Sequence, residues 1–198
     1  RQMCIRDSYK GNLLLEKGCA KGIMAFLGRG IIEFIERMRI LSTIPQIRDV
    51  LFIGAAGSLS DDLPIGDFNI PKYAIPFENV SDVYVSYFTA TPQANDEVLG
   101  EVYGYAKEAG ANVHSVLHAT VLLPHSETTE FLRYLRSIGV YTIDMEVSAF
   151  YKFARFYGKR AASVLWVSDM ALRGELINNK EKVADILFKI VLKFLKLI

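Results

Sequence analysis

Strand-like and helix-like segments alternate along almost the whole chain, and this alternation constrains the fold more than any other feature. Short apolar or alternating runs predict strands at residues 12–18, 47–57, 65–75, 82–88, 112–123, 140–144 and 161–169. Apolar residues at helical spacing predict helices at residues 23–41, 95–110, 126–139, 147–157 and 182–198. The pattern is typical of an α/β fold, a single domain whose twisted, mostly parallel or mixed central sheet is flanked by helices in three layers.

Length and composition fit one domain of this class. The chain has 198 residues, of which 51% are hydrophobic and 12% aromatic, enough for one substantial core. Its net charge of +1 gives no electrostatic sign of a nucleic-acid partner. The two cysteines do not make a disulfide framework, so we expect a reducing, cytoplasmic compartment.

The C-terminal segment 182–198 predicts an amphipathic helix with one apolar face and a cationic face opposite. The apolar face carries Val183, Ile186, Leu187, Ile190, Val191, Phe194 and Leu195. Such a helix either packs on a sheet or lies on a membrane surface. We expect it to pack on the sheet. No apolar run in the sequence reaches the length of a membrane span, so we expect no membrane partner.

Residues 1–8 read RQMCIRDS, show no periodicity and resemble the translation of a transposon-end adapter used in sequencing libraries. We therefore expect a non-native leader at 1–8, a domain at 9–198, and a natural N-terminal segment that is missing. An ordinary disordered N-terminus is the alternative.

Glycines or polar residues occupy three predicted strand ends, which is where ligands bind in open α/β sheets. The three stretches are GAAGS at 54–58, DME at 144–146 and VSD at 167–169. Glu146 stands where a strand gives way to a helix, and complementarity to the helix dipole is the simplest explanation for an acid there. Asp169 ends an apolar strand, where partial desolvation raises a carboxyl pKa and suits a general acid. Capping of the next segment is the alternative.

The glycine stretch does not make a dinucleotide site, because it lacks the G-x-G-x-x-G pattern. Gly54 and Gly57 instead allow a ligand to approach the backbone closely. A tight turn without a ligand explains them equally well.

Three stretches, in this order, resemble the nucleoside phosphorylase family: GAAGSLSDDLPIGD, IDMEVSAFYKFARFYGKRAASVL and VSD. The family includes purine nucleoside phosphorylases, uridine phosphorylases and methylthioadenosine/adenosylhomocysteine nucleosidases, and the likeness runs from about Tyr9 to Asp169. It implies a pentosyltransferase of purine salvage that cleaves the N-glycosidic bond of a purine nucleoside. It also implies no cofactor, phosphate as co-substrate, and a homo-oligomer in which a neighbour closes the active site.

The resemblance also implies roles for individual residues. Glu146 holds the ribose 2′- and 3′-hydroxyls, since an ionised carboxylate accepts two hydrogen bonds, and Met145 packs against the sugar. The negative charge of Glu146 also favours an oxocarbenium-like transition state. Asp169, supported by Ser168, donates a proton to purine N7. Family members that act on uridine generally lack this aspartate, which favours purines.

Two substitutions depart from the phosphorylases, which carry an Arg and a Ser or Thr as phosphate ligands where this chain has Phe52 and Ala55. Neither side chain binds phosphate, although backbone N–H groups of Gly54, Ala55 and Gly57 can do so. Family precedent favours phosphorolysis to free base and ribose 1-phosphate. The substitutions favour a hydrolytic nucleosidase or a non-catalytic nucleoside-binding protein, so these alternatives stay open.

Three further residues are candidates. Arg173, four positions after Asp169, is predicted to adjust the acid or bind an anion. His125 precedes a helix in the region that forms the base pocket of the family, with a structural role as the alternative. Lys21 is either an anion ligand or a solvated lysine. The spacing of the three histidines predicts no metal site: they are His114, His118 and His125.

Overall fold

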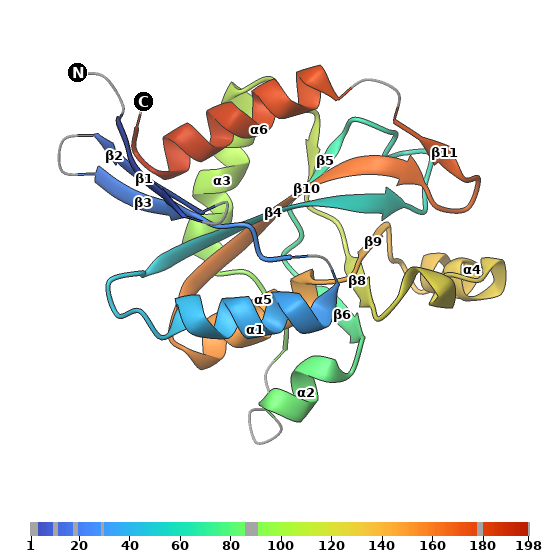
Figure 1. Ribbon diagram of the computed structural model, residues 1–198. Helices are drawn as coiled ribbons and strands as arrows, with labels where there is room; N and C mark the ends of the chain where they lie inside the picture. Colours follow the sequence, from blue (N-terminus) through green and yellow to red (C-terminus); the bar gives the residue numbers. More distant parts are fainter. Residues whose placement is uncertain are drawn as a thin grey trace.

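The computed structural model describes residues 4–9, 12–17, 20–28, 30–85, 91–177 and 180–197. Its centre is an eight-stranded mixed sheet with the strand order β6-β8-β9-β4-β10-β5-β7, and β11 pairs with β10 (Figure 1). These strands are β4 (Asp49–Ser58), β5 (Phe68–Asn69), β6 (Ala74–Phe77), β7 (Val113–His114), β8 (His118–Val121), β9 (Thr142–Asp144), β10 (Arg160–Met170) and β11 (Glu175–Leu176).

Helices cover both faces of this sheet, which confirms the predicted three-layer α/β fold (Figure 1). They are α1 (Ile31–Ser42), α2 (Val80–Tyr84), α3 (Asp96–Glu108), α4 (Thr129–Ser137), α5 (Val147–Phe156) and α6 (Glu181–Phe194), with a 3₁₀ turn, η1, at Pro124–Ser126. One core cluster packs α1 and α5 against β4 and β10, and a second packs α3 and α6 against β5 and β10.

The C-terminal helix packs on the sheet as expected. Its apolar residues Val183, Ile186 and Ile190 are buried in the cluster that α3 and β10 also form. Burying this face stabilises the domain by about 1.5–3 kcal/mol for each fully buried side chain. Among the described residues, no helix is both long and apolar enough to cross a membrane.

A second, three-stranded antiparallel sheet precedes the first helix. It consists of β1 (Cys4–Tyr9), β2 (Asn12–Lys17) and β3 (Ala20–Met24). The predicted leader at 1–8 therefore overlaps a strand that pairs with β2, while residues 1–3 lie outside the described residues. Its non-native origin stays a prediction.

Two predicted elements were wrong. The helix predicted at 23–41 begins only at Ile31, because Gly28 and Gly30 adopt positive φ angles that helical residues do not have, and the residues up to Met24 form β3. The strand predicted at 82–88 is instead the short helix α2, with residues 86–88 outside the described part of the chain. The carboxylate of Glu78 accepts the backbone N–H of Ser81 at 2.8 Å and so holds the first turn of α2.

Two other predicted strands are each divided in two. Residues 65–75 give β5 and the start of β6, and the interruption contains Pro71, which cannot donate a ladder hydrogen bond. Residues 112–123 give β7 and β8. The predicted helix at 126–139 begins at Thr129, where the side chain of Thr128 accepts the N–H of Phe131.

Candidate active site

The three predicted strand ends meet around Gly57. In the parallel pair of β4 and β10, Gly57 lies opposite Asp169, and in the antiparallel pair of β4 and β9 it lies opposite Ile143. A Cβ atom on Gly57 would lie 3.0 Å from Oδ2 of Asp169 and 3.3 Å from Cγ1 of Ile143. Glycine thus gives room for the close approach of the Asp169 carboxylate, whereas the sequence suggested the approach of a ligand.

Glu146 lies at the junction of β9 and α5, as the N-terminal flanking residue of the helix. Burial and, secondarily, the neighbouring charge of Asp144 raise the pKa of Glu146 from 4.5 to about 7. The backbone N–H groups of Met145 and Gly30 oppose this shift by donating hydrogen bonds to the carboxylate. Near neutral pH, Glu146 thus exists in both its ionised and its protonated form.

The hydrogen bond from Gly30 places the start of α1 beside Glu146, although more than 100 residues separate Gly30 from Glu146 in the chain. Met145 is half-buried and packs against the apolar cluster that contains Ile143. The turn at 145–146 is therefore framed by β9, α5 and the beginning of α1, which are the elements that position both predicted sugar-binding residues.

Asp169 and Ser168 form a hydrogen-bonded pair at the end of β10. The hydroxyl Oγ of Ser168 lies 2.6 Å from Oδ1 of Asp169 and 3.3 Å from the carbonyl oxygen of Ala56. The shorter distance indicates that the hydroxyl donates to the carboxylate. Ser168 thus contacts Asp169, and its supporting role in catalysis stays a prediction.

A second acid near Asp169 was missed by the sequence analysis. Glu127 follows η1 and is half-buried, and burial together with the charge of Asp169 raises the pKa of Glu127. Its loop also carries His125, which is exposed. The signal in the sequence was the position of Glu127 two residues after His125, in the region that resembles the base pocket of the family.

Arg173 lies in the turn between β10 and β11. Its guanidinium forms ion pairs with Asp61 at 3.0 Å and with Glu175 at 3.1 Å. Both partners are acids other than Asp169, so these contacts give Arg173 a structural role, and its predicted catalytic role stays a prediction. Lys21 belongs to β3, and its side chain lies outside the described residues.

Phe52 occupies apolar surroundings. Its ring contacts Phe34 of α1 edge-on, with centroids 5.5 Å apart, and Phe150 of α5 at 5.6 Å. A Cβ atom on Gly54 would lie 2.8 Å from this ring, so Gly54 makes room for Phe52. Ala55, by contrast, is exposed although it belongs to a central strand of the sheet. Ala55 is thus exposed, while the position of the family arginine is filled by an aromatic ring.

Two histidines of the predicted strand region form buried or partly buried pairs with acids. Nε2 of His114 lies 2.9 Å from Oδ2 of Asp67. His118 is fully buried, and its Nε2 lies 2.8 Å from Oδ1 of Asp144. Within the described part of the chain, no group of three or more His, Cys, Asp or Glu side chains is arranged to hold a metal ion.

Comparisons with known proteins converge on one family. The profile of the Phosphorylase superfamily matches residues 20–196. The purine nucleoside phosphorylase DeoD-type of Bacillus cereus (strain ZK / E33L) is 27% identical over 177 residues, which are 88% of this chain and 71% of that protein. The protein of the same description from Bacillus thuringiensis (strain Al Hakam) gives the same values. A solved structure of a P. knowlesi homologue of P. falciparum PNP shares the fold, with a TM-score of 0.74 and 18% identity over 93% of this chain and 76% of that chain.

Proposed function

The chain belongs to the phosphorylase superfamily, and on this premise we propose that it cleaves the N-glycosidic bond of a purine nucleoside by phosphorolysis. The products are the free base and ribose 1-phosphate. The observation that carries the proposal is that Gly57 pairs with Asp169 of β10 and with Ile143 of β9, because β9 leads three residues later to Glu146 and both acid-bearing strand ends therefore adjoin the glycine stretch. The similarity to purine nucleoside phosphorylases supports it.

In this proposal Glu146 and Asp169 act on opposite parts of the nucleoside. The ionised carboxylate of Glu146 accepts hydrogen bonds from the 2′- and 3′-hydroxyls and stabilises positive charge that develops on the sugar. Asp169 gives a proton to N7 of the purine while the bond between C1′ and N9 breaks, so that the base leaves as a neutral molecule. An oxygen of phosphate then forms the new bond to C1′.

The second candidate function is hydrolysis, in which water instead of phosphate accepts the sugar. It is suggested by the residues at the position of the phosphate site. The apolar contacts of Phe52 with Phe34 and Phe150 favour this candidate, since a phosphate dianion is costly to bury without partners. The exposure of Ala55 leaves room for phosphate beside the glycine stretch, where successive backbone N–H groups are a known way to bind an anion. We place phosphorolysis first because of the similar purine nucleoside phosphorylases.

Product analysis tests the proposal. The protein is incubated with adenosine, inosine, guanosine, methylthioadenosine and uridine, with and without phosphate, and the products are separated chromatographically. Base and ribose 1-phosphate formed only with phosphate support phosphorolysis. Free sugar formed regardless of phosphate supports hydrolysis. Binding of a nucleoside without release of base would overturn both and favour a binding protein.

Variants connect the reaction to the site. Asp169→Asn is expected to slow purine cleavage by about 10²–10⁴-fold, the usual contribution of a general acid. Glu146→Gln is expected to lower kcat/KM for ribonucleosides. Asp185→Asn is the matched control, because Asp185 is an exposed acid of α6 that pairs with Lys189 of the same helix. Equal rates in all three variants would contradict the assignment.

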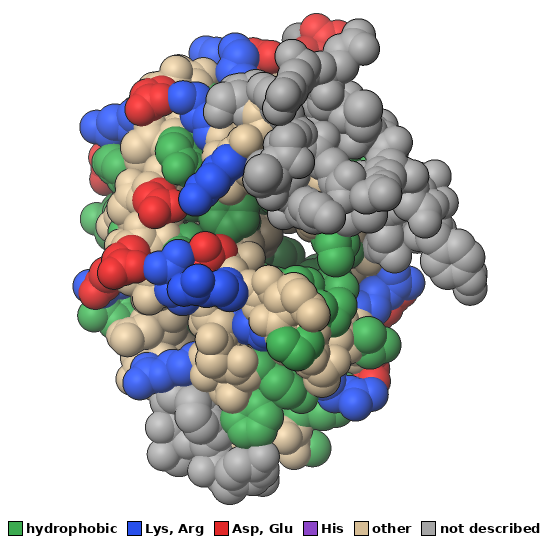
Figure 2. All heavy atoms as spheres, turned by 90° about the vertical axis from the view of Figure 1, so that its left-hand side faces the viewer, with side chains coloured by type: hydrophobic (Ala, Val, Ile, Leu, Met, Phe, Trp, Pro, Cys, Tyr) green, Lys and Arg blue, Asp and Glu red, His purple; other side chains and the backbone are tan. Residues whose placement is uncertain are grey.

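We further propose that the protein acts as a cytoplasmic homo-oligomer that needs no metal or organic cofactor. Exposed apolar side chains on α1 and α2 support an interface there, and they include Ile32, Ile40 and Val83. Figure 2 shows hydrophobic side chains gathered in the lower part of the face that it presents. Analytical ultracentrifugation of the wild type and of Ile40→Glu tests the proposal, with a shift toward monomer expected in the variant.

A further inference from the structure

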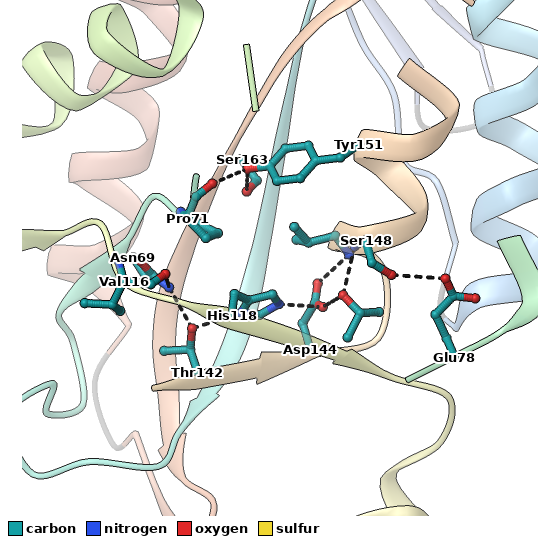
Figure 3. A network of polar contacts seen from close by, with 12 residues as sticks. Asn69, Pro71, Glu78, Val116, His118, Thr142, Asp144, Ser148, Tyr151 and Ser163 are labelled. Carbon is teal, nitrogen blue, oxygen red and sulfur yellow. Dashed lines mark hydrogen bonds and ion pairs between the residues drawn. The ribbon is translucent and has the colours of Figure 1, made fainter. Parts of the chain in front are cut away.

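A continuous set of buried hydrogen bonds runs from β5 through β8 and β9 to the start of α5 (Figure 3). It begins at Asn69 of β5, whose side-chain Nδ2 donates to Oγ1 of Thr142 at 2.7 Å. Thr142 is 2.9 Å from Nδ1 of His118, and Nε2 of His118 is 2.8 Å from Oδ1 of Asp144. The set thus links three strands of the central sheet to the residue that precedes the turn.

The hydrogen bonds define the role of Nε2 of His118. The Asp144 carboxylate can only accept, so Nε2 of His118 carries a proton. Oγ1 of Thr142 accepts from Asn69 and also contacts Nδ1 of His118, to which it can donate or from which it can accept. His118 is therefore a fixed donor toward Asp144, with no exposure to solvent.

Asp144 in turn joins two elements on either side of the turn. Its Oδ1 accepts from His118 and from Oγ1 of Thr120 at 2.8 Å, and both donors belong to β8. Its Oδ2 accepts the backbone N–H of Val147, the first residue of α5, at 2.9 Å. Met145 and Glu146 lie between the two ends of this bridge, so their backbone is held at both sides.

The same set continues into α5. Oγ1 of Thr120 accepts the N–H of Ser148 at 2.8 Å, and Oγ of Ser148 donates to Oε1 of Glu78 at 3.1 Å. The first two amides of α5 are thus bound by side chains of β9 and β8 rather than by water. This arrangement fixes where the helix begins, and Glu146 directly precedes that point.

We propose that His118 is a positioning residue for the sugar-binding turn: it holds Asp144 in place, and Asp144 sets the position of Glu146 relative to the ribose hydroxyls. The role in substrate binding rests on the proposed function. His118 acts through Asp144 and does not touch the sugar. Asp144 is also the charge whose proximity raises the pKa of Glu146, so its displacement changes both the position and the ionisation of Glu146.

Three variants test the proposal. His118→Phe keeps an aromatic ring but removes the donor to Asp144. His118→Gln is the conservative variant, because its amide offers an N–H in place of Nε2. Tyr151→Phe is the matched control, because it removes another buried hydrogen-bonding group, the hydroxyl of a residue in α5. This hydroxyl contacts the carbonyl oxygen of Pro71 and Oγ of Ser163 at 2.7 Å each, outside the set around Asp144 (Figure 3).

The first measurement is the ratio of kcat/KM for a purine ribonucleoside to that for its 2′-deoxy analogue. Loss of one hydrogen bond to a charged group costs about tenfold, so we expect His118→Phe to lower this ratio by about tenfold. His118→Gln is expected to stay within about threefold of the wild type, and Tyr151→Phe to leave the ratio unchanged even if it lowers stability. An unchanged ratio in a folded His118→Phe, or an equal drop in Tyr151→Phe, would overturn the proposal.

The second measurement does not depend on activity. Hydrogen exchange at the amides of Val147 and Ser148 is expected to accelerate at least about tenfold in His118→Phe, while the amide of Val102 in α3 keeps its protection. If the wild type cleaves no nucleoside, the proposed function fails, and exchange at these two amides still decides whether His118 holds the turn. If His118→Phe does not fold, the isosteric Thr142→Val takes its place in both measurements, with a smaller drop of about threefold expected.

Discussion

Replacement of Glu146 by glutamine is expected to stabilise the folded protein, and to do so in a pH-dependent way. Burial and the charge of Asp144 raise the pKa of Glu146 from 4.5 to about 7. The folded state therefore binds this proton more tightly than the unfolded state does. As the pH rises from below 4.5 through 7, the wild type loses stability, because the unfolded chain ionises Glu146 first.

The size of the effect follows from the two pKa values. A shift of one pKa unit corresponds to about 1.4 kcal/mol, so the full penalty above pH 7 is roughly 3 kcal/mol, and at pH 6 it is about 2 kcal/mol. Glutamine is nearly isosteric and carries no charge, and its side-chain oxygen still accepts from Gly30 and Met145. Glu146→Gln therefore removes the penalty and keeps the acceptor.

The assay is urea unfolding of the wild type and of Glu146→Gln at pH 5 and pH 8. We expect the variant to be more stable by about 3 kcal/mol at pH 8 and by less than about 1 kcal/mol at pH 5. Glu130→Gln, at an exposed position of α4, is the control and is expected to change stability by no more than about 0.5 kcal/mol at either pH. Equal stabilisation at both pH values, or none at pH 8, would refute the reasoning.

Three further predictions concern the same region. Only the ionised Glu146 accepts hydrogen bonds from both sugar hydroxyls, so kcat/KM for a ribonucleoside is expected to rise with pH through about 7. Asp144→Asn removes a charge that raises the pKa of Glu146, so a pH–rate profile of this variant is expected to rise at lower pH. Gly57→Ala places a methyl group 3.0 Å from Oδ2 of Asp169, so we expect turnover to fall by at least about tenfold while thermal unfolding shows a change below about 1 kcal/mol. Phe52→Ala leaves a cavity between α1 and α5, so urea unfolding is expected to show a loss of about 3 kcal/mol in stability. The control is Phe188→Ala, at an exposed position, which is expected to leave the stability unchanged.

The sequence by itself determined the class of the fold. Period-two and helical patterns depend on which face of each segment is apolar, and that information is local. It therefore predicted the strands β4 and β10 and the helices α3, α5 and α6 at nearly their observed positions. It also identified the three strand ends, because a glycine or a polar residue after an apolar run is visible without any knowledge of the partner strand.

Only the tertiary structure decided how these ends face one another. The tight space at Gly57 comes from the carboxylate of Asp169, which is 112 positions away in the chain and adjacent across the sheet. The pKa of Glu146 is raised chiefly by burial, which depends on how distant segments pack and leaves no local pattern in the sequence.

The same reason explains what sequence analysis missed or misread. The segment at 82–88 alternates like a strand, yet α2 forms there because the buried carboxylate of Glu78 binds its first turn. In the sequence, His118 is only a polar residue within a predicted strand. Its hydrogen bond to Asp144 forms because β8 and β9 are parallel neighbours in the sheet. Local patterning predicts most elements of this protein. The charges and hydrogen bonds of its site depend on burial and on contacts between distant segments, which arise only when the chain is folded.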